Sequence, residues 1–113
     1  MARYLMLFDD GTMDIPAEEM AVVGQAAHEV VFAAMDAGVW IFGGGLESQR
    51  ARLVGPDGLA TDGPYSETRE VIGGFLVVDV PSWEEALVWT GKFATACRCA
   101  QEVREIMTAP LIP

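Results

Sequence analysis

The order of apolar and polar positions predicts a chain that switches between strands and helices. Residues 3–8, mostly aromatic and aliphatic and closed by Asp9-Asp10-Gly11, are typical of a strand and its turn. Between residues 18 and 37 the apolar positions recur with a helical period, and Gly38 can end this helix in left-handed geometry. A second strand is expected at residues 39–42. It runs into Gly43-Gly44-Gly45, where the bare backbone allows a bulge, a close packing contact or the floor of a pocket.

The second half of the chain predicts a short hairpin, a strand, a helix and a closing strand. Residues 52–54 and 59–61 flank a strong turn sequence at 55–58, in which Asp57 serves the turn rather than catalysis. The β-branched run at 75–80 is typical of a strand buried on both faces. Ser82 and Glu85 predict a capping box at a helix start, and residues 101–107 alternate as a last strand does. The apolar face of this helix is expected to hold Ala86, Leu87, Phe93 and Ala94.

Without the inserted hairpin, this order is βαββαβ, the split arrangement of ferredoxin-like α+β domains. Residues 1–113 suffice for a single domain and leave no room for a second core. Two helices would cover one face of an antiparallel sheet. The opposite face is therefore expected to form a homodimer interface or the wall of a pocket.

Charge and cysteine content narrow the classes of partner and compartment. Seventeen acidic residues against seven basic ones give a net charge of -10, which repels phosphate backbones and anionic lipid surfaces. We therefore expect no nucleic-acid partner and no membrane contact. No apolar stretch reaches the roughly 18 residues of a membrane span, so a cytoplasmic location is expected. Cys97 and Cys99 are expected to be reduced, partly buried thiols on a strand, with a redox role as the alternative.

His28 is the only histidine, and an imidazole is the side chain best suited to proton transfer near neutral pH. If Ala27 is at the centre of the first helix's apolar face, a step of about 100° places His28 at the edge of that face. This position predicts a half-buried side chain beside the sheet. A purely structural histidine is the alternative.

Asp62 begins a rigid Asp-Gly-Pro bend and is the acid that could pair with His28. A carboxylate bonded to one ring nitrogen fixes the tautomer and raises the basicity of the other. Turn formation by the Asp62 side chain is the competing role. Arg69 offers a planar fork to an anionic substrate or forms exposed ion pairs, and Tyr65 offers a hydroxyl or anchors the bend.

Recognisable cofactor motifs are missing from the sequence. There is no phosphate-binding glycine loop, no dinucleotide fingerprint and no nucleophile elbow. No group of three or more metal-ligand residues stands out in the sequence. We therefore expect no metal and no cofactor, and chemistry by acid–base groups alone; a metal held by His28 and carboxylates is the alternative.

The segment from Asp62 to Phe75 resembles the defining motif of the DGPF proteins, a branch of the YCII-related family. Its matching residues are Asp62-Gly63-Pro64-Tyr65, Glu67, Arg69-Glu70 and Gly73-Gly74-Phe75, with Tyr65 replacing the usual Phe and Arg69 the usual Lys. The resemblance covers nearly the whole chain and implies a dimeric ferredoxin-like α+β barrel.

The same resemblance implies an active site. YCII-like proteins carry a His/Asp pair, and one relative is a dehydrochlorinase acting on a chlorinated hydroxyquinol. His28, ten residues before Gly38, resembles the family histidine in its spacing. The family's Asp-Pro segment has no counterpart in residues 92–100, so Asp62 is the substitute candidate.

Two hypotheses of function follow. The first is a small cofactor-independent enzyme of lyase, isomerase or dehydrochlorinase type, in which His28 is the general acid or base for a small cyclic or aromatic substrate. Asp62 would orient His28, and the substrate would contact Gly44, Tyr65 and Arg69. The second hypothesis is a non-catalytic dimeric module that binds a small ligand or serves as an accessory protein.

Overall fold

The computed structural model describes residues 2–9, 15–46, 52–62 and 72–108. Four strands form an antiparallel sheet in the order β2-β5-β1-β6. These strands are β1 (Ala2–Asp9), β2 (Trp40–Gly45), β5 (Ile72–Val80) and β6 (Glu102–Glu105). Helix α1 (Met20–Asp36) follows the 3-10 turn η2 (Ala17–Glu19), and helix α2 (Trp83–Cys97) follows β5. A separate two-stranded sheet is formed by β3 (Arg52–Val54) and β4 (Ala60–Asp62).

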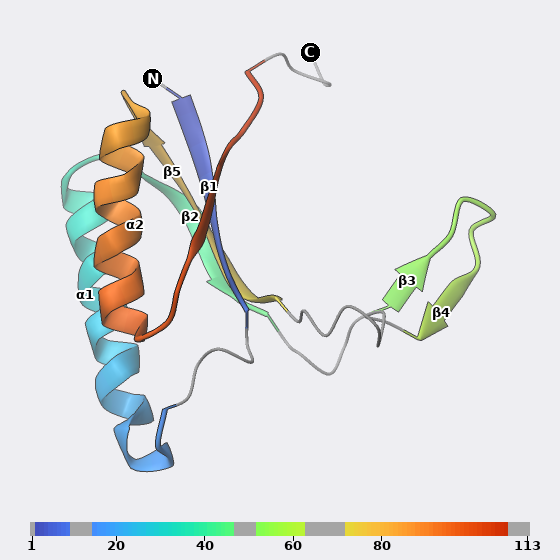
Figure 1. The fold of residues 1–113 in the computed structure, drawn as a ribbon, viewed down its shortest axis with the longest axis horizontal. Helices are drawn as coiled ribbons and strands as arrows, with labels where there is room; N and C mark the ends of the chain where they lie inside the picture. Colours follow the sequence, from blue (N-terminus) through green and yellow to red (C-terminus); the bar gives the residue numbers. More distant parts are fainter. Residues whose placement is uncertain (1, 10–14, 47–51, 63–71, 109–113) are drawn as a thin grey trace.

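The two helices lie side by side against the same face of the four-stranded sheet (Figure 1). With the β3–β4 hairpin set aside, the order is βαββαβ and the sheet is antiparallel throughout. The predicted ferredoxin-like α+β fold with an inserted hairpin is therefore confirmed.

The hydrophobic core lies between the helices and the sheet. Alternate residues of the two central strands face the helices, among them Tyr4 and Met6 of β1 and Val78 and Val80 of β5. The helices contribute Ala34, Ala86 and Phe93 to the same cluster. This packing fixes both helices on one side of the sheet.

Three local features that the sequence predicts are present in the structure. Gly38 takes a φ of 75° after α1, in the left-handed region. Ser82 caps α2, since its side chain accepts a hydrogen bond from the Glu85 backbone N–H at 3.2 Å. Asp57 serves its turn, since its Oδ1 accepts a hydrogen bond from the Leu59 N–H at 2.9 Å.

Two predictions about α2 are wrong. Leu87 is 45 % exposed, and the buried residues of α2 are Ala86, Thr90 and Phe93. The Thr90 hydroxyl can be buried because it donates a hydrogen bond to the Ala86 carbonyl one turn back, at 2.7 Å. Cys97 ends the helix rather than lying on a strand, and the left-handed residue Arg98 (φ 56°) separates it from Cys99.

The sheet face opposite the helices, here called the open face, carries an apolar patch beside four charged residues, Arg3, Asp79, Glu102 and Arg104. The pairing register places Leu5 beside Val77 and Leu7 beside Phe75 on this face, since Tyr4 and Met6 point the other way. The ring of Phe42 meets the ring of Phe75 edge-on at 5.2 Å between centroids, and Phe42 remains 57 % exposed.

Candidate functional site

A cavity of about 360 Å³ lies between α1 and the sheet. One wall is the inner side of α1, and the others come from β1, β2, β5 and the end of α2. The α1 residues in this wall are Met20, Val23, Gly24, Ala27, His28 and Val31. Apolar residues dominate the rest, and four of them are aromatic: Phe8, Trp40, Phe75 and Phe93.

The glycine run of β2 shapes one side of the cavity. A Cβ on Gly43 would lie 2.5 Å from the Phe75 carbonyl oxygen and 2.9 Å from the Leu76 Cα, so backbone packing requires glycine there. A Cβ on Gly44 would meet no atom within 4 Å. All three glycines line the cavity, and β2 is bulged just before them, between Trp40 and Phe42. The run thus combines close packing with a cavity wall, and the bulge precedes it.

A second close contact involves Gly74 of β5. A Cβ there would lie 2.7 Å from Cε1 of Phe8 and 3.0 Å from the Gly44 carbonyl oxygen. Because Gly74 has no side chain, the Phe8 ring can lie against the sheet and form part of the cavity wall.

The imidazole of His28 lies at the edge of the cavity. The side chain is exposed, so the prediction of half burial is wrong. As expected, His28 lies at the margin of the apolar face of α1. This margin lines the cavity. The ring stacks on Phe32, with 6.3 Å between centroids and 23° between planes. His28 therefore has access both to the cavity and to water.

Cys97 is the other titratable group that lines the cavity among the described residues. Burial, and to a lesser extent the neighbouring Cys99 thiol, raise the pKa of the Cys97 thiol above its ordinary value. The thiol is accordingly protonated at neutral pH and is a poor nucleophile. Cys97 and Cys99 form no disulfide in the described part of the chain.

Gln101, just after α2, also lines the cavity. Its Nε2 donates a hydrogen bond to Sγ of Cys99 at 3.6 Å. Its Oε1 is buried and has no hydrogen-bond partner among the described residues. The sequence does not indicate that Gln101 lines a cavity. The residue begins a strand with alternating polar and apolar positions, where a polar side chain is usually on the surface.

The site residues predicted from the sequence divide into two groups. His28 and Gly44 both line the cavity. Asp62 ends β4, where its backbone pairs with Arg52 in the two-stranded sheet, but its side chain lies outside the described residues. Tyr65 and Arg69 also lie outside them. The pairing of His28 with Asp62 and the roles of Tyr65 and Arg69 stay predictions.

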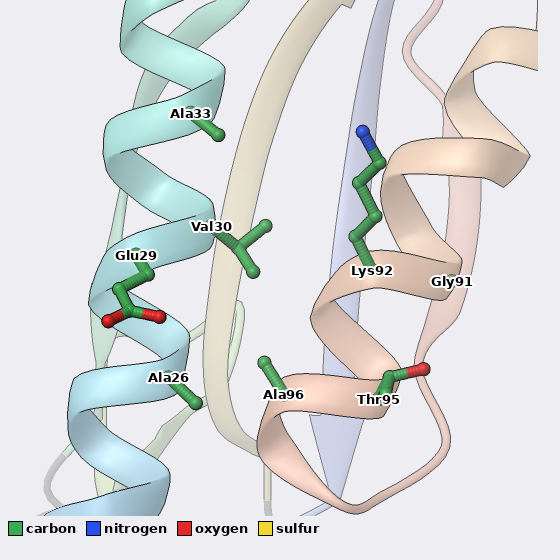
Figure 2. Close-up of a pocket in the computed structure, with 8 residues that line it drawn as sticks. All are labelled: Ala26, Glu29, Val30, Ala33, Gly91, Lys92, Thr95 and Ala96. Atoms are coloured by element: carbon green, nitrogen blue, oxygen red, sulfur yellow. The ribbon is translucent and has the colours of Figure 1, made fainter.

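A second hollow is an open groove of about 540 Å³ between α1 and α2 (Figure 2). Its walls carry mostly small side chains, with Glu29 on α1 and Lys92 on α2. The Lys92 ammonium is partly engaged elsewhere, since Nζ lies 4.3 Å from the centroid of the Trp89 ring. The groove contains no group suited to proton transfer at neutral pH, so it is a weaker candidate than the cavity.

The described residues contain no group of three or more His, Cys, Asp or Glu side chains placed to hold a metal ion. Neither helix of the described chain has the length and apolar character needed to cross a membrane.

Comparison with known proteins identifies the family. No curated protein matches the chain. One similar solved structure is the 5-chloro-2-hydroxyhydroquinone dehydrochlorinase of Burkholderia phenoliruptrix in complex with 2,5-dihydroxybenzoquinone, with a TM-score of 0.46, 14% sequence identity and 93% of each chain covered. The family model of the YCII-related domain matches residues 3–109. Because this match spans nearly the whole chain, the protein belongs to the YCII-related family.

Proposed function

We propose that this protein is a small cofactor-independent enzyme of the DGPF branch, in which His28 exchanges a proton with a small ring-shaped substrate bound in the cavity. One observation carries the proposal. A largely apolar cavity between α1 and the sheet has, at its edge, an imidazole that is also open to water.

The size and walls of the cavity support a small aromatic or cyclic substrate. Its volume of about 360 Å³ falls within the range of about 300–1,000 Å³ in which ligand pockets are found. The rings of Trp40 and Phe93 form a tilted pair with 6.5 Å between centroids, and Phe8 adds a third ring. Aromatic walls favour a flat ligand, which can stack against them or meet their edges.

The titratable groups support His28 as the proton carrier. Of the two such groups among the described lining residues, the Cys97 thiol has a raised pKa and is protonated at neutral pH. Histidine is the side chain most often used as general acid or base, so His28 can take a proton from the substrate and then return it. Exposure of His28 to water lets the ring exchange its proton with solvent between turnovers. In this proposal Asp62 orients the ring, and Gly44, Tyr65 and Arg69 contact the substrate.

A second candidate function is ligand binding without catalysis. It is favoured by one observation: no carboxylate lines the cavity among the described residues, so the structure provides His28 with no acidic partner there. In that case the protein would hold the same class of ligand and leave it unchanged.

A ligand screen followed by a turnover assay separates the two functions. Small aromatic and alicyclic compounds that raise the melting temperature are incubated with the protein, and the products are followed by NMR. We expect conversion that falls by about 10²–10⁴-fold in His28→Gln, with binding retained. Glu29→Gln, one residue along α1 and outside the cavity, is the matched control. Binding of several compounds without conversion of any would favour the binding module.

We also propose that the protein is a homodimer joined through the open face. The exposed Phe42 ring and its apolar neighbours on β1 and β5 support this proposal. Sedimentation is expected to give twice the chain mass of 12.2 kDa, and Phe42→Glu to shift the protein toward the monomer. A wild-type protein that sediments as a monomer would exclude the dimer. The cytoplasmic location stays a prediction.

A further inference from the structure

We propose that the β3–β4 hairpin (residues 52–62), here called the arm, packs on the second copy of the chain when two copies join through their open faces. The inference rests on the proposed homodimer and adds a second region of contact to it. In a two-fold dimer this contact occurs twice, because the arm of each copy lies against the other copy.

The arm has a defined shape but no core of its own. Its two strands pair at three positions. The turn between them is closed by hydrogen bonds that the Gly55 N–H donates to the Leu59 carbonyl at 3.0 Å and the Gly58 N–H to the Gly55 carbonyl at 2.9 Å. None of residues 52–61 is buried. A two-stranded hairpin is marginally stable at best in water, so the arm requires a surface on which to pack.

The apolar side chains of the arm are suited to such a contact. Val54 and Leu59 are 66 % and 67 % exposed, more than any other large apolar side chain of the described residues except Met107. Leu46, just after β2, and Ile72, the first residue of β5, are exposed as well. Burial of these side chains against a second protein surface would be favourable.

The position of the arm indicates which surface it packs on. In Figure 1 the two helices lie on one side of the four-stranded sheet, and the arm lies on the other side, beyond the open face. The chain is extended accordingly, since its radius of gyration is 15.7 Å, whereas a compact domain of 113 residues has about 13 Å. A second copy bound on the open face would therefore lie beside the arm.

The size of the open face also favours an added contact. Neighbouring strands are about 4.8 Å apart, so the four strands span about 19 Å, and the eight residues of β1 span about 27 Å. As a plane, the open face thus covers about 500 Å². A stable interface of standard size buries about 800 Å² on each partner. The arm supplies area that the open face alone lacks.

Val54→Ser tests the contribution of the arm, and Val22→Ser is the matched control. Val22 is 60 % exposed and belongs to α1, on the opposite side of the sheet from the arm. The dissociation constant of the dimer is measured by sedimentation over a series of dilutions. We expect Val54→Ser to raise it about 100-fold, because the apolar contact is lost twice in each dimer, and Val22→Ser to leave it unchanged.

The outcomes separate the role of the arm from the proposed homodimer. If the wild type dimerises and the two variants have equal dissociation constants, the role of the arm is refuted while the dimer stands. If the wild type is a monomer at every concentration, the proposed homodimer is wrong, and the inference about the arm falls with it.

A second readout needs no variant. In dimers of one ¹³C-labelled and one unlabelled copy, nuclear Overhauser effects are expected between the methyl groups of Val54 and Leu59 and protons of the unlabelled copy. A dimer in which these methyl groups contact only their own chain, or a different protein, or only water would overturn the proposal even if Val54→Ser did not fold.

Discussion

Substitution of Gly43 by alanine tests whether close packing of β2 on β5 fixes the cavity wall. The added Cβ would lie 2.5 Å from the Phe75 carbonyl oxygen and 2.9 Å from the Leu76 Cα, where ordinary contacts begin at 3.4 Å. Both atoms belong to the backbone of the neighbouring strand, so no side chain can rotate away. The two strands would have to separate locally, at the expense of their pairing between Gly43 and Leu76.

The expected loss can be estimated from two opposing effects. Overpacking of this kind costs about 1–3 kcal/mol, and replacing glycine by alanine recovers about 0.4–1 kcal/mol by restricting the unfolded chain. A net loss of about 1–2 kcal/mol remains. For a domain of 113 residues this corresponds to a melting temperature lower by about 4–8 °C.

Gly44→Ala is the matched control, because its Cβ would meet no atom within 4 Å. Thermal unfolding of both variants is followed by circular dichroism. Gly44→Ala is expected to melt at or slightly above the wild-type temperature, and Gly43→Ala clearly below it. The reasoning is refuted if Gly43→Ala is as stable as Gly44→Ala.

Three further predictions concern α2 and the thiol at its end. Ser82→Ala should lower the free energy of unfolding in urea by about 1 kcal/mol and Ser82→Gly by only a few tenths; equal losses would argue against the cap. Phe93→Ala should cost about 3–5 kcal/mol in the same assay, because the ring is 2 % exposed; a loss below about 1 kcal/mol would contradict its place in the core. The pKa of the Cys97 thiol is higher in the folded protein than in the unfolded chain. The stability that this difference contributes is therefore fully present below the pKa of the unfolded chain and is lost as the pH rises through the pKa of the folded protein. Alkylation of Cys97 by iodoacetamide, resolved from Cys99 by tryptic cleavage after Arg98, should show a midpoint above the ordinary value of 9.0, and a midpoint below it would exclude the raised pKa.

The fold could be predicted because local signals agree with the overall pattern. Ser82, Gly38 and the turn at Asp57 mark ends of elements by their own backbone chemistry, and the structure has all three. The errors arose where a tertiary contact decided the outcome. Leu87 is exposed, whereas Thr90 is buried because its hydroxyl donates a hydrogen bond within α2, which a hydropathy pattern cannot show.

The site was only partly predictable for the same reason. The position of His28 at a helix margin follows from a count of residues, and Gly44 follows from the bare run of glycines. The unpartnered oxygen of Gln101 depends on a bond to Cys99 and on burial, so it is visible only in three dimensions. A single sequence also cannot specify whether two residues as far apart as His28 and Asp62 meet.

The central claim is that the cavity between α1 and the sheet, and not the groove between the helices, binds a small aromatic molecule. Two glycines of the helices provide a matched test. Gly24 of α1 lines the cavity, Gly91 of α2 lines the groove (Figure 2), and a Cβ at either position would meet no atom within 4 Å. Leucine at either position should favour its helix by about 0.8 kcal/mol, so both variants are expected to fold.

The decisive measurement is the affinity for p-cresol of Gly24→Leu beside that of Gly91→Leu. We predict that Gly24→Leu loses binding because its side chain occupies the cavity, while Gly91→Leu binds as the wild type does. Loss of binding in Gly91→Leu with full binding in Gly24→Leu would contradict the account.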